Sequence, residues 1–290
     1  MRLCLIYFIA NETASHLSMI TMRSLSALLL VAASTGFACD NPFTYSYLTE
    51  TLKPGKITIE QWATARLGRD IGAGYDARYR GFDFKTEIEQ GISENEQISY
   101  YINYRYFDTA TREGLQFDGF QIAYMRMLAD PDKNSWGQAI YIEPGYSQAS
   151  GKNGSFRDQY SLELKYLLQH NFGEKLDWVY AANLVAEVER TPATGSDAVS
   201  FKITQGIAHE INANWYAGLE AVASVEWAEL NNFEYAAIFV GPCVRYQNES
   251  GFFTAVTAMT QVYGSPADKG NLNVSEKSPY EVRIKVGINF

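Results

Sequence analysis

The chain has 290 residues, of which 47% are hydrophobic and 14% aromatic, and its formal net charge is -9. The surplus of acids argues against nucleic acid as a partner, and a mean hydropathy of -0.21 excludes a bundle of membrane helices. No apolar run reaches the roughly 18 residues of a membrane helix, so the hydrophobic residues must be interleaved with polar ones. That pattern is typical of a transmembrane β-barrel.

The first segment, residues 1–38, has the composition of a signal peptide. Arg23 precedes the apolar run Leu25 to Ala33, and small residues before position 39 suit cleavage after Ala38. Met22 is then the expected true start of the protein.

Residues 39–55 form an aromatic lead-in before the first predicted strand. Its polar and aromatic residues, including Tyr45 and Tyr47, suit a small plug inside a barrel. A periplasmic tail or an extra strand is the interpretation that we prefer, by a small margin, from the sequence. Cys39 at the start of the lead-in is a candidate for lipidation, or for a disulfide with Cys243.

Residues 56–290 alternate polar and apolar side chains in segments that turn residues separate. An even number of strands is the rule in bacterial single-chain barrels. We predict twelve strands: Lys56 to Leu67, Tyr75 to Ile92, Gln97 to Phe107, Phe117 to Leu128, Trp136 to Tyr146, Gln159 to His170, Leu176 to Glu189, Val199 to His209, Asn214 to Trp227, Phe233 to Tyr246, Gly251 to Tyr263 and Pro279 to Phe290.

The last of these segments alternates most strictly. Apolar residues occupy every second position from Tyr280 to Phe290, with Glu281, Arg283 and Lys285 among the residues between them. Such a strand presents one face to an apolar medium and one to water. It resembles the closing strand of Gram-negative outer-membrane barrels, and that resemblance implies the barrel-assembly machinery as a partner through Phe290.

The connections fall into two sets that alternate along the chain, one of short turns and one of mostly longer loops. Outer-membrane barrels place short turns in the periplasm and longer loops outside. Trp136, Trp178 and Trp215 each follow a short turn, whereas Trp227 precedes a connection of the other set. We therefore predict that these four tryptophans belong to aromatic girdles at the membrane surface.

The positions between the apolar residues are predicted to face the lumen. The candidate residues along a solute path are Lys85, Glu87, Arg105, Glu143, Glu163, Lys165, Glu187, Lys202, Glu220, Glu226 and Arg283. Facing charges in a wet lumen form ion pairs, so structural pairing is the first expectation at any one of them. Their surplus of carboxylates favours cations over anions in a channel.

Arg78 and Arg80 share the outward phase of the second predicted strand near its outer end. Guanidinium groups there would suit the phosphates of lipopolysaccharide. Ordinary solvation of the rim is the alternative.

No catalytic, metal or nucleotide motif stands out. An outer-membrane lipid hydrolase would need a serine beside a histidine, and the mature histidines, His170 and His209, fall at predicted periplasmic turns without a serine motif beside them. We therefore predict no enzyme, no cofactor and no metal.

The lead-in from Tyr45 to Lys56, which runs into Ile59-Glu60-Gln61-Trp62, resembles the start of a family of uncharacterised proteobacterial outer-membrane barrel proteins. The resemblance covers most of the mature chain and implies a fold but no activity. The sequence thus predicts an all-β, single up-and-down antiparallel barrel in the outer membrane, in contact with its lipid and lipopolysaccharide. Its expected function is a narrow, weakly cation-preferring channel for small solutes, and a non-conducting structural or ligand-binding barrel is the alternative.

Overall fold

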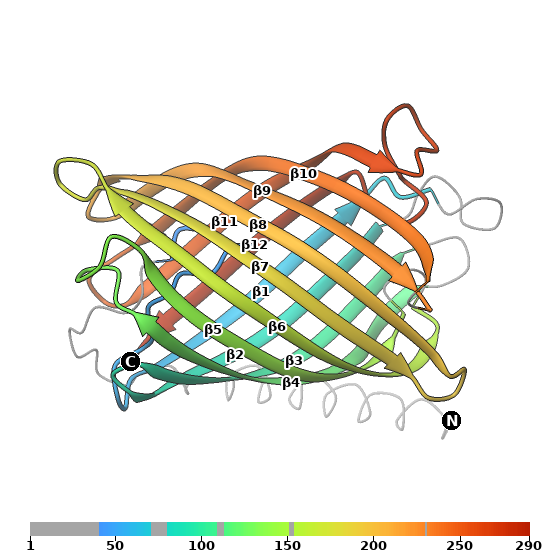
Figure 1. Ribbon diagram of the computed structural model, residues 1–290, viewed down its shortest axis with the longest axis horizontal. Coiled ribbons are helices and arrows are strands. Elements are labelled where there is room, and N and C mark those ends of the chain that lie inside the picture. The colour runs from blue at the N-terminus through green and yellow to red at the C-terminus, as the bar shows by residue number, and fades with distance from the viewer. Residues whose placement is uncertain (1–40, 71–79, 109–112, 151–153, 230) are drawn as a thin grey trace, which may run out of the picture. The chain divides into compact units, whose positions relative to one another are not determined.

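The computed structural model describes residues 41–70, 80–108, 113–150, 154–229 and 231–290. These residues form a closed antiparallel barrel in which each strand pairs with its neighbours in sequence and β12 pairs with β1 (Figure 1). The strands are β1 (Ile57–Leu67), β2 (Arg80–Ser93), β3 (Glu96–Asp108), β4 (Glu113–Ala129), β5 (Gly137–Ala149), β6 (Phe156–Phe172), β7 (Trp178–Thr191), β8 (Ser196–Asn212), β9 (Trp215–Ala228), β10 (Asn232–Gln247), β11 (Phe252–Ser265) and β12 (Tyr280–Asn289). The predicted fold class and the number of strands are confirmed.

The strand bounds differ from the predicted ones mainly at the ends of β4, β6 and β8, which are longer. β6, for example, begins at Phe156 and ends at Phe172. Strand pairing continues past the lipid layer, where nothing forces apolar and polar residues to alternate, so the pattern ends before the hydrogen bonds do. Tyr75 to Tyr79 of the predicted second strand lie outside the described residues.

Period-two alternation sets which side chains meet lipid. On β12, Tyr280, Ile284 and Val286 are exposed on the outer surface, while Lys285 between them is buried inside. The barrel closes where β1 pairs with β12. This pairing extends from Thr58 and Asn289 to Leu67 and Tyr280 without a register shift. A closed barrel leaves no unpaired strand edge, as a lipid environment requires. Separately, the described residues contain no helix that is long and apolar enough to span a membrane.

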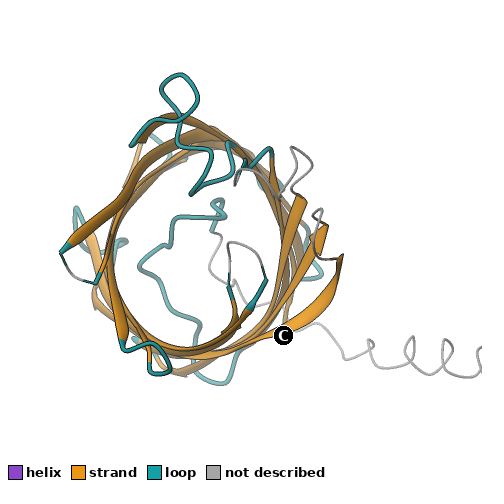
Figure 2. Ribbon diagram, turned by 90° about the vertical axis from the view of Figure 1, so that its right-hand side faces the viewer, coloured by secondary structure: helices purple, strands orange, loops and turns teal. Residues whose placement is uncertain are grey.

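The two rims of the barrel differ. The short-turn rim carries the turns after β2, β4, β6, β8 and β10, and the long-loop rim carries the other connections. The described part of the lead-in, residues 41–53, precedes β1 and lies inside the ring of strands (Figure 2). Its hydrogen bonds to the wall place it in the half next to the short-turn rim. Asn41 at its start and Leu52 near its end both bond to wall residues at that rim, whereas Tyr45 lies highest. The lead-in is therefore an arch that rises from the short-turn rim and returns to it.

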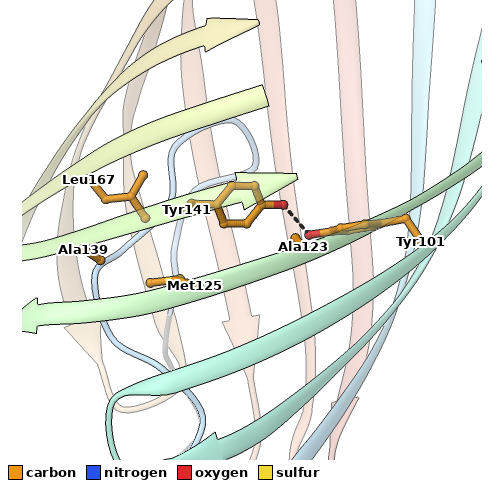
Figure 3. Close-up of a cluster of buried hydrophobic side chains, with 6 residues drawn as sticks. All are labelled: Tyr101, Ala123, Met125, Ala139, Tyr141 and Leu167. Atoms are coloured by element: carbon orange, nitrogen blue, oxygen red, sulfur yellow. Dashed lines mark hydrogen bonds between the residues drawn. The ribbon is translucent and has the colours of Figure 1, made fainter. Parts of the chain in front are cut away.

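A hydrophobic core fills this half of the barrel. One cluster joins Tyr101, Ala123, Met125, Ala139, Tyr141 and Leu167 on β3 to β6, with the two tyrosine hydroxyls 2.9 Å apart (Figure 3). The ring of Tyr47 in the lead-in packs on this cluster. Phe43 and Leu48 form a second cluster with Cys243 and the alanines of the opposite wall. The lead-in thus supplies the centre of a core whose shell is the barrel wall.

Candidate functional site: an open cup closed by the lead-in

The other half of the barrel contains a cavity of about 920 Å³, which we call the cup. Its lining runs from the long-loop connections at residues 191–198 and 276–278 down to Tyr45 and Tyr47 of the lead-in. The lead-in is therefore the floor of the cup, and the long-loop rim is its mouth.

One wall of the cup carries a chain of ion pairs across β12, β1, β2, β3 and β4. Arg66 lies 2.7 Å from Asp83 and 3.7 Å from Glu281. Arg105 lies 3.6 Å from the same Asp83 and 2.7 Å from Asp118. Each carboxylate of this wall is thus neutralised by a guanidinium group, which is the geometry that makes a partly buried charge tolerable.

The opposite wall, on β6, β7 and β8, carries a second network. The Glu163 carboxylate forms ion pairs with Lys165 at 2.9 Å and Lys202 at 3.3 Å. Lys202 also forms an ion pair with Glu187 at 2.9 Å. Nearer the mouth, Arg157 pairs with Glu189 at 3.2 Å. Structural pairing, the first expectation from the sequence, is what the geometry provides at these residues.

The floor of the cup has a different character, because cations there lie over aromatic rings. The Lys85 ammonium lies 4.2 Å from the centre of the Tyr101 ring and 5.3 Å from that of Trp62. The Arg283 guanidinium lies 3.9 Å from the Tyr45 ring and 5.5 Å from Trp62. Rings attract cations through their quadrupole but accept no strong hydrogen bond from them.

Glu220 of β9 is the main anchor of the lead-in. Its carboxylate accepts hydrogen bonds from three successive backbone N–H groups, those of Thr44 at 3.0 Å, Tyr45 at 2.9 Å and Ser46 at 2.9 Å. The Thr257 hydroxyl donates a further one at 2.6 Å. Hydrogen bonds to a carboxylate are the stronger kind, so this one side chain fixes the top of the arch.

Amide side chains of the wall hold the rest of the lead-in backbone. Asn183 bonds Tyr47 in both directions, accepting from its N–H at 2.7 Å and donating to its carbonyl at 2.9 Å. Gln169 accepts from the Thr49 N–H and Gln97 from the Leu52 N–H, each at 2.9 Å. These side chains replace the strand partner that an extended backbone inside a barrel lacks.

Glycines of the wall make room for the lead-in. A Cβ atom on Gly206 would lie 2.5 Å from the Phe43 ring, one on Gly137 2.4 Å from Thr49 Oγ1, and one on Gly91 2.2 Å from the Lys53 carbonyl oxygen. Real side-chain contacts do not come this close. The wall is therefore shaped to fit this segment.

The structure places nine of the predicted lumen residues at the cup: Lys85, Arg105, Glu143, Glu163, Lys165, Glu187, Lys202, Glu226 and Arg283. It places the other two elsewhere. Glu87 is 1% exposed and Glu220 is 2% exposed, the latter beneath the lead-in, so neither faces the cup. Sequence alternation assigns a side chain to the inside of a barrel but gives no sign that a distant segment covers it.

Trp136, Trp178 and Trp215 lie at the short-turn rim with exposed rings. Two of them belong to a stack in which Trp136 lies 4.9 Å from His170, and Trp178 lies 4.7 Å from His209. Trp227 lies at the long-loop rim between Phe201 and Phe233. The positions suit the predicted girdles.

Arg80 is exposed and pairs with Asp108 at 2.5 Å, and Arg78 lies outside the described residues.

His170 Nδ1 contacts the Ser135 carbonyl oxygen, and His209 Nε2 lies 3.2 Å from Asp177. Neither histidine is bonded to a serine hydroxyl within the described ranges. Cys243 is a buried free thiol, whereas Cys39 is not among the described residues.

The barrel is similar to solved structures of outer-membrane proteins. The COG4313 outer membrane channel from Pseudomonas putida F1 matches with a TM-score of 0.57 at 9% identity, over 83% of this chain and 98% of that one. The β domain of the Bordetella autotransporter BrkA matches with a TM-score of 0.52 at 10% identity, over 81% of this chain and 100% of that one. The NanC porin matches with a TM-score of 0.50 at 11% identity, over 80% of this chain and 98% of that one. At such identities the likeness establishes the fold, that of a bacterial outer-membrane β-barrel.

Comparison with functionally curated proteins gave no match. One family model matches, over residues 35–290, and its description is a family of unknown function (DUF6662).

Proposed function

The chain belongs to the DUF6662 family, and we propose that it is an outer-membrane channel for small polar solutes, closed in this conformation by its own lead-in. The observation that carries the proposal is the cup of about 920 Å³ with its charged walls. A barrel that served only as a membrane anchor would have no need of such a space, and small barrels of that kind fill it with side chains. Because long loops face outward in such barrels, the cup opens to the outside.

The lead-in separates the cup from the periplasmic side. Phe43, Leu48 and Leu52 are buried, and the ring of Tyr47 packs on the core cluster of the wall. We assign residues 39–55 as the plug of the channel and 56–290 as its barrel, with residues 1–38 as the signal peptide. Both ends of the arch lie at the short-turn rim, so a displaced lead-in would leave through the periplasmic mouth.

The similarity to an outer membrane channel and to the NanC porin supports this function by analogy of fold only. A weak preference for cations belongs to the proposal, because the mature chain keeps the acid surplus of the sequence. The preference is expected to be small, since most cup carboxylates are paired with lysine or arginine.

The test is single-channel recording of the refolded mature protein in a planar bilayer, beside a variant that lacks residues 41–53. We expect rare, brief openings from the full chain and steady unitary currents from the deletion variant. A salt gradient gives the reversal potential, which should indicate a modest preference for K⁺ over Cl⁻. Glu220→Gln, which keeps the whole chain and weakens one anchor, should fall between the two.

A non-conducting, ligand-binding barrel is the second candidate. The close approach of the lead-in to Gly91, Gly137 and Gly206 favours a non-conducting barrel, because a segment that fits the wall so closely resembles a permanent part of the core. Silence from all three proteins, each shown to be folded and inserted, would reject the channel and leave this candidate. Lipid hydrolysis has no support from the contacts of His170 and His209.

A further inference from the structure

We propose that the floor of the cup is a binding site for the carboxylate group of a small organic acid, held between Lys85 and Arg283. The inference rests on the proposed function in one respect, that the cup is where a solute enters. It adds the chemical class of one solute, an anion that this local site would bind although the lumen as a whole weakly favours cations, and neither the family nor the fold assigns that class.

Lys85 is the first observation. Its ammonium group lines the cup, lies over the Tyr101 and Trp62 rings, and forms no ion pair or hydrogen bond with the residues that the structure describes. Its three N–H donors therefore have no acceptor in the part of the chain that the structure describes. A half-buried ammonium without an acceptor is costly, so this group is poised for an anion or for water.

The hydrogen bonds of Arg283 are the second observation. Arg283 donates from Nε to the Thr64 hydroxyl at 2.9 Å and from Nη1 to the Thr44 carbonyl at 3.0 Å. A guanidinium group has five N–H donors, so donors remain, and no carboxylate of the described residues pairs with it. Both cations lie near the Trp62 ring of β1, 5.3 and 5.5 Å from its centre, with Lys85 on β2 and Arg283 on β12 to either side of that strand.

Lys85 and Arg283 differ from most of the basic residues on the cup walls. Five other basic side chains that line the cup each contact a carboxylate at 3.3 Å or less: Arg66, Arg105, Arg157, Lys165 and Lys202. These five bases are thereby paired with acids, whereas Lys85 and Arg283 are not. Lys277 near the mouth also lines the cup without an ion pair to a described residue, and its ammonium lies 4.2 Å from the centre of the Tyr235 ring. The floor is consequently an attractive place for an anion, although the chain as a whole is acidic.

The surroundings favour a singly charged ligand with a polar body. Glu143 and Glu163 act on Lys85 through space, which disfavours a dianion. The half-buried Tyr45 ring offers a flat face beside the cations. Asn103 and Ser161 also line the cup, and their amide and hydroxyl groups suit the hydroxyl groups of a sugar acid.

The experiment is isothermal titration calorimetry of the refolded full-length mature protein in detergent micelles. Gluconate is the probe, glucose is its uncharged counterpart, and inorganic phosphate at pH 8 is the dianion. We expect gluconate to bind, glucose to bind at least tenfold more weakly, and phosphate to bind more weakly than gluconate. This comparison uses the unaltered protein and does not depend on the folding of any variant.

Two variants locate the site. Lys85→Met removes the charge at similar volume and should weaken gluconate binding at least tenfold. Lys133→Met is the matched control, because it removes one positive charge from an exposed lysine on the turn after β4, and it should leave binding unchanged. Heat-dependent mobility in electrophoresis confirms that each variant is folded, and Lys85→Gln replaces Lys85→Met if the latter is not.

Absence of gluconate binding, or equal binding by Lys85→Met, overturns the site. Tighter binding of phosphate than of gluconate overturns the carboxylate assignment. The outcome is independent of conduction: gluconate binding by a barrel that never conducts would support this site and reject the channel, and conduction without binding would do the reverse.

Discussion

Arg283 donates a hydrogen bond from Nη1 to the carbonyl oxygen of Thr44, 3.0 Å away. The bond joins the last strand of the barrel to the top of the lead-in, and the same guanidinium group lies at the floor of the cup. A ligand that binds the remaining donors of Arg283 therefore contacts the same side chain that holds the lead-in. Solute binding and closure share one side chain.

The Glu220 anchor gives the first prediction. Glu220→Ala leaves the N–H groups of Thr44, Tyr45 and Ser46 without their acceptor, and we expect a loss of about 3 kcal/mol in the free energy of unfolding, in line with hydrogen bonds to a charged group. Urea titration of the refolded protein measures it. Glu187→Gln is the control, since Glu187 bonds Lys202 and does not touch the lead-in. An equal loss in both variants would mean that Glu220 has no special role.

The close contact between Gly206 and Phe43 gives the second prediction. Gly206→Ala places a Cβ atom 2.5 to 2.8 Å from ring atoms of Phe43, so we expect a destabilisation of about 1–3 kcal/mol from overpacking. In the double variant with Phe43→Ala the clash disappears, and the added cost of Gly206→Ala should fall close to zero. Urea titration of the four proteins measures the coupling. Additive costs would show that the lead-in does not occupy this seat.

Lys277 gives a prediction for pH. Burial lowers the pKa of its ammonium group from 10.5 to about 8. The groups that face it are Glu226 and Glu281, which raise the pKa, Arg66 and Lys202, which lower it, and the ring of Tyr235 at 4.2 Å. Between about pH 8 and 10.5 the unfolded chain holds this proton and the folded chain does not, so this residue's contribution to stability rises with pH across that window.

The measurement is the midpoint of thermal unfolding at pH 7.5 and pH 10 for the unaltered protein and for Lys277→Met. Other groups titrate in the same range, so the difference between the two proteins isolates Lys277. We expect the unaltered protein to gain relative to the variant at the higher pH. A constant difference, or one of opposite sign, would contradict the buried position of this lysine.

The terminal aromatic residue gives the fourth prediction. Deletion of Phe290 should lower the amount of folded barrel in the outer membrane severalfold, because a terminal aromatic strand is the expected assembly signal. Phe290→Tyr keeps the ring and should assemble normally. Heat-dependent mobility of the outer-membrane fraction measures both, and normal assembly of the deletion variant would count against the signal.

Much of the barrel is predictable from the sequence, because lipid outside and water inside impose a local rule. Leu162 and Leu164 face lipid and Glu163 between them faces the cup for the same reason that they alternate in sequence. The short and long connections and the places of Trp136 and Trp178 follow from the same rule. Each of these inferences needs only residues near one another in the chain.

The interior contacts are not predictable in this way. Thr44 and Glu220 lie 176 positions apart, and no local pattern marks either as a partner of the other. The conformation of residues 266–279 was likewise not predictable. Asn273 in this segment is fully buried and hydrogen-bonded to Gln261, although the sequence of the segment is that of an ordinary polar loop. The seats at Gly91 and Gly206 were the available signal, since a glycine at an inward strand position indicates a close approach of another segment.

The seam between β1 and β12 also has a consequence for the kinetics of folding. Thr58 and Asn289 are bonded partners at opposite ends of the barrel sequence, and the links from Glu220 to the lead-in span 174 to 176 residues. Contacts between residues so far apart form late, because the chain must lose the most entropy to make them. The lead-in therefore has no fixed partner until most of the sheet exists. Pairing of β12 with β1 therefore decides when the lead-in becomes ordered.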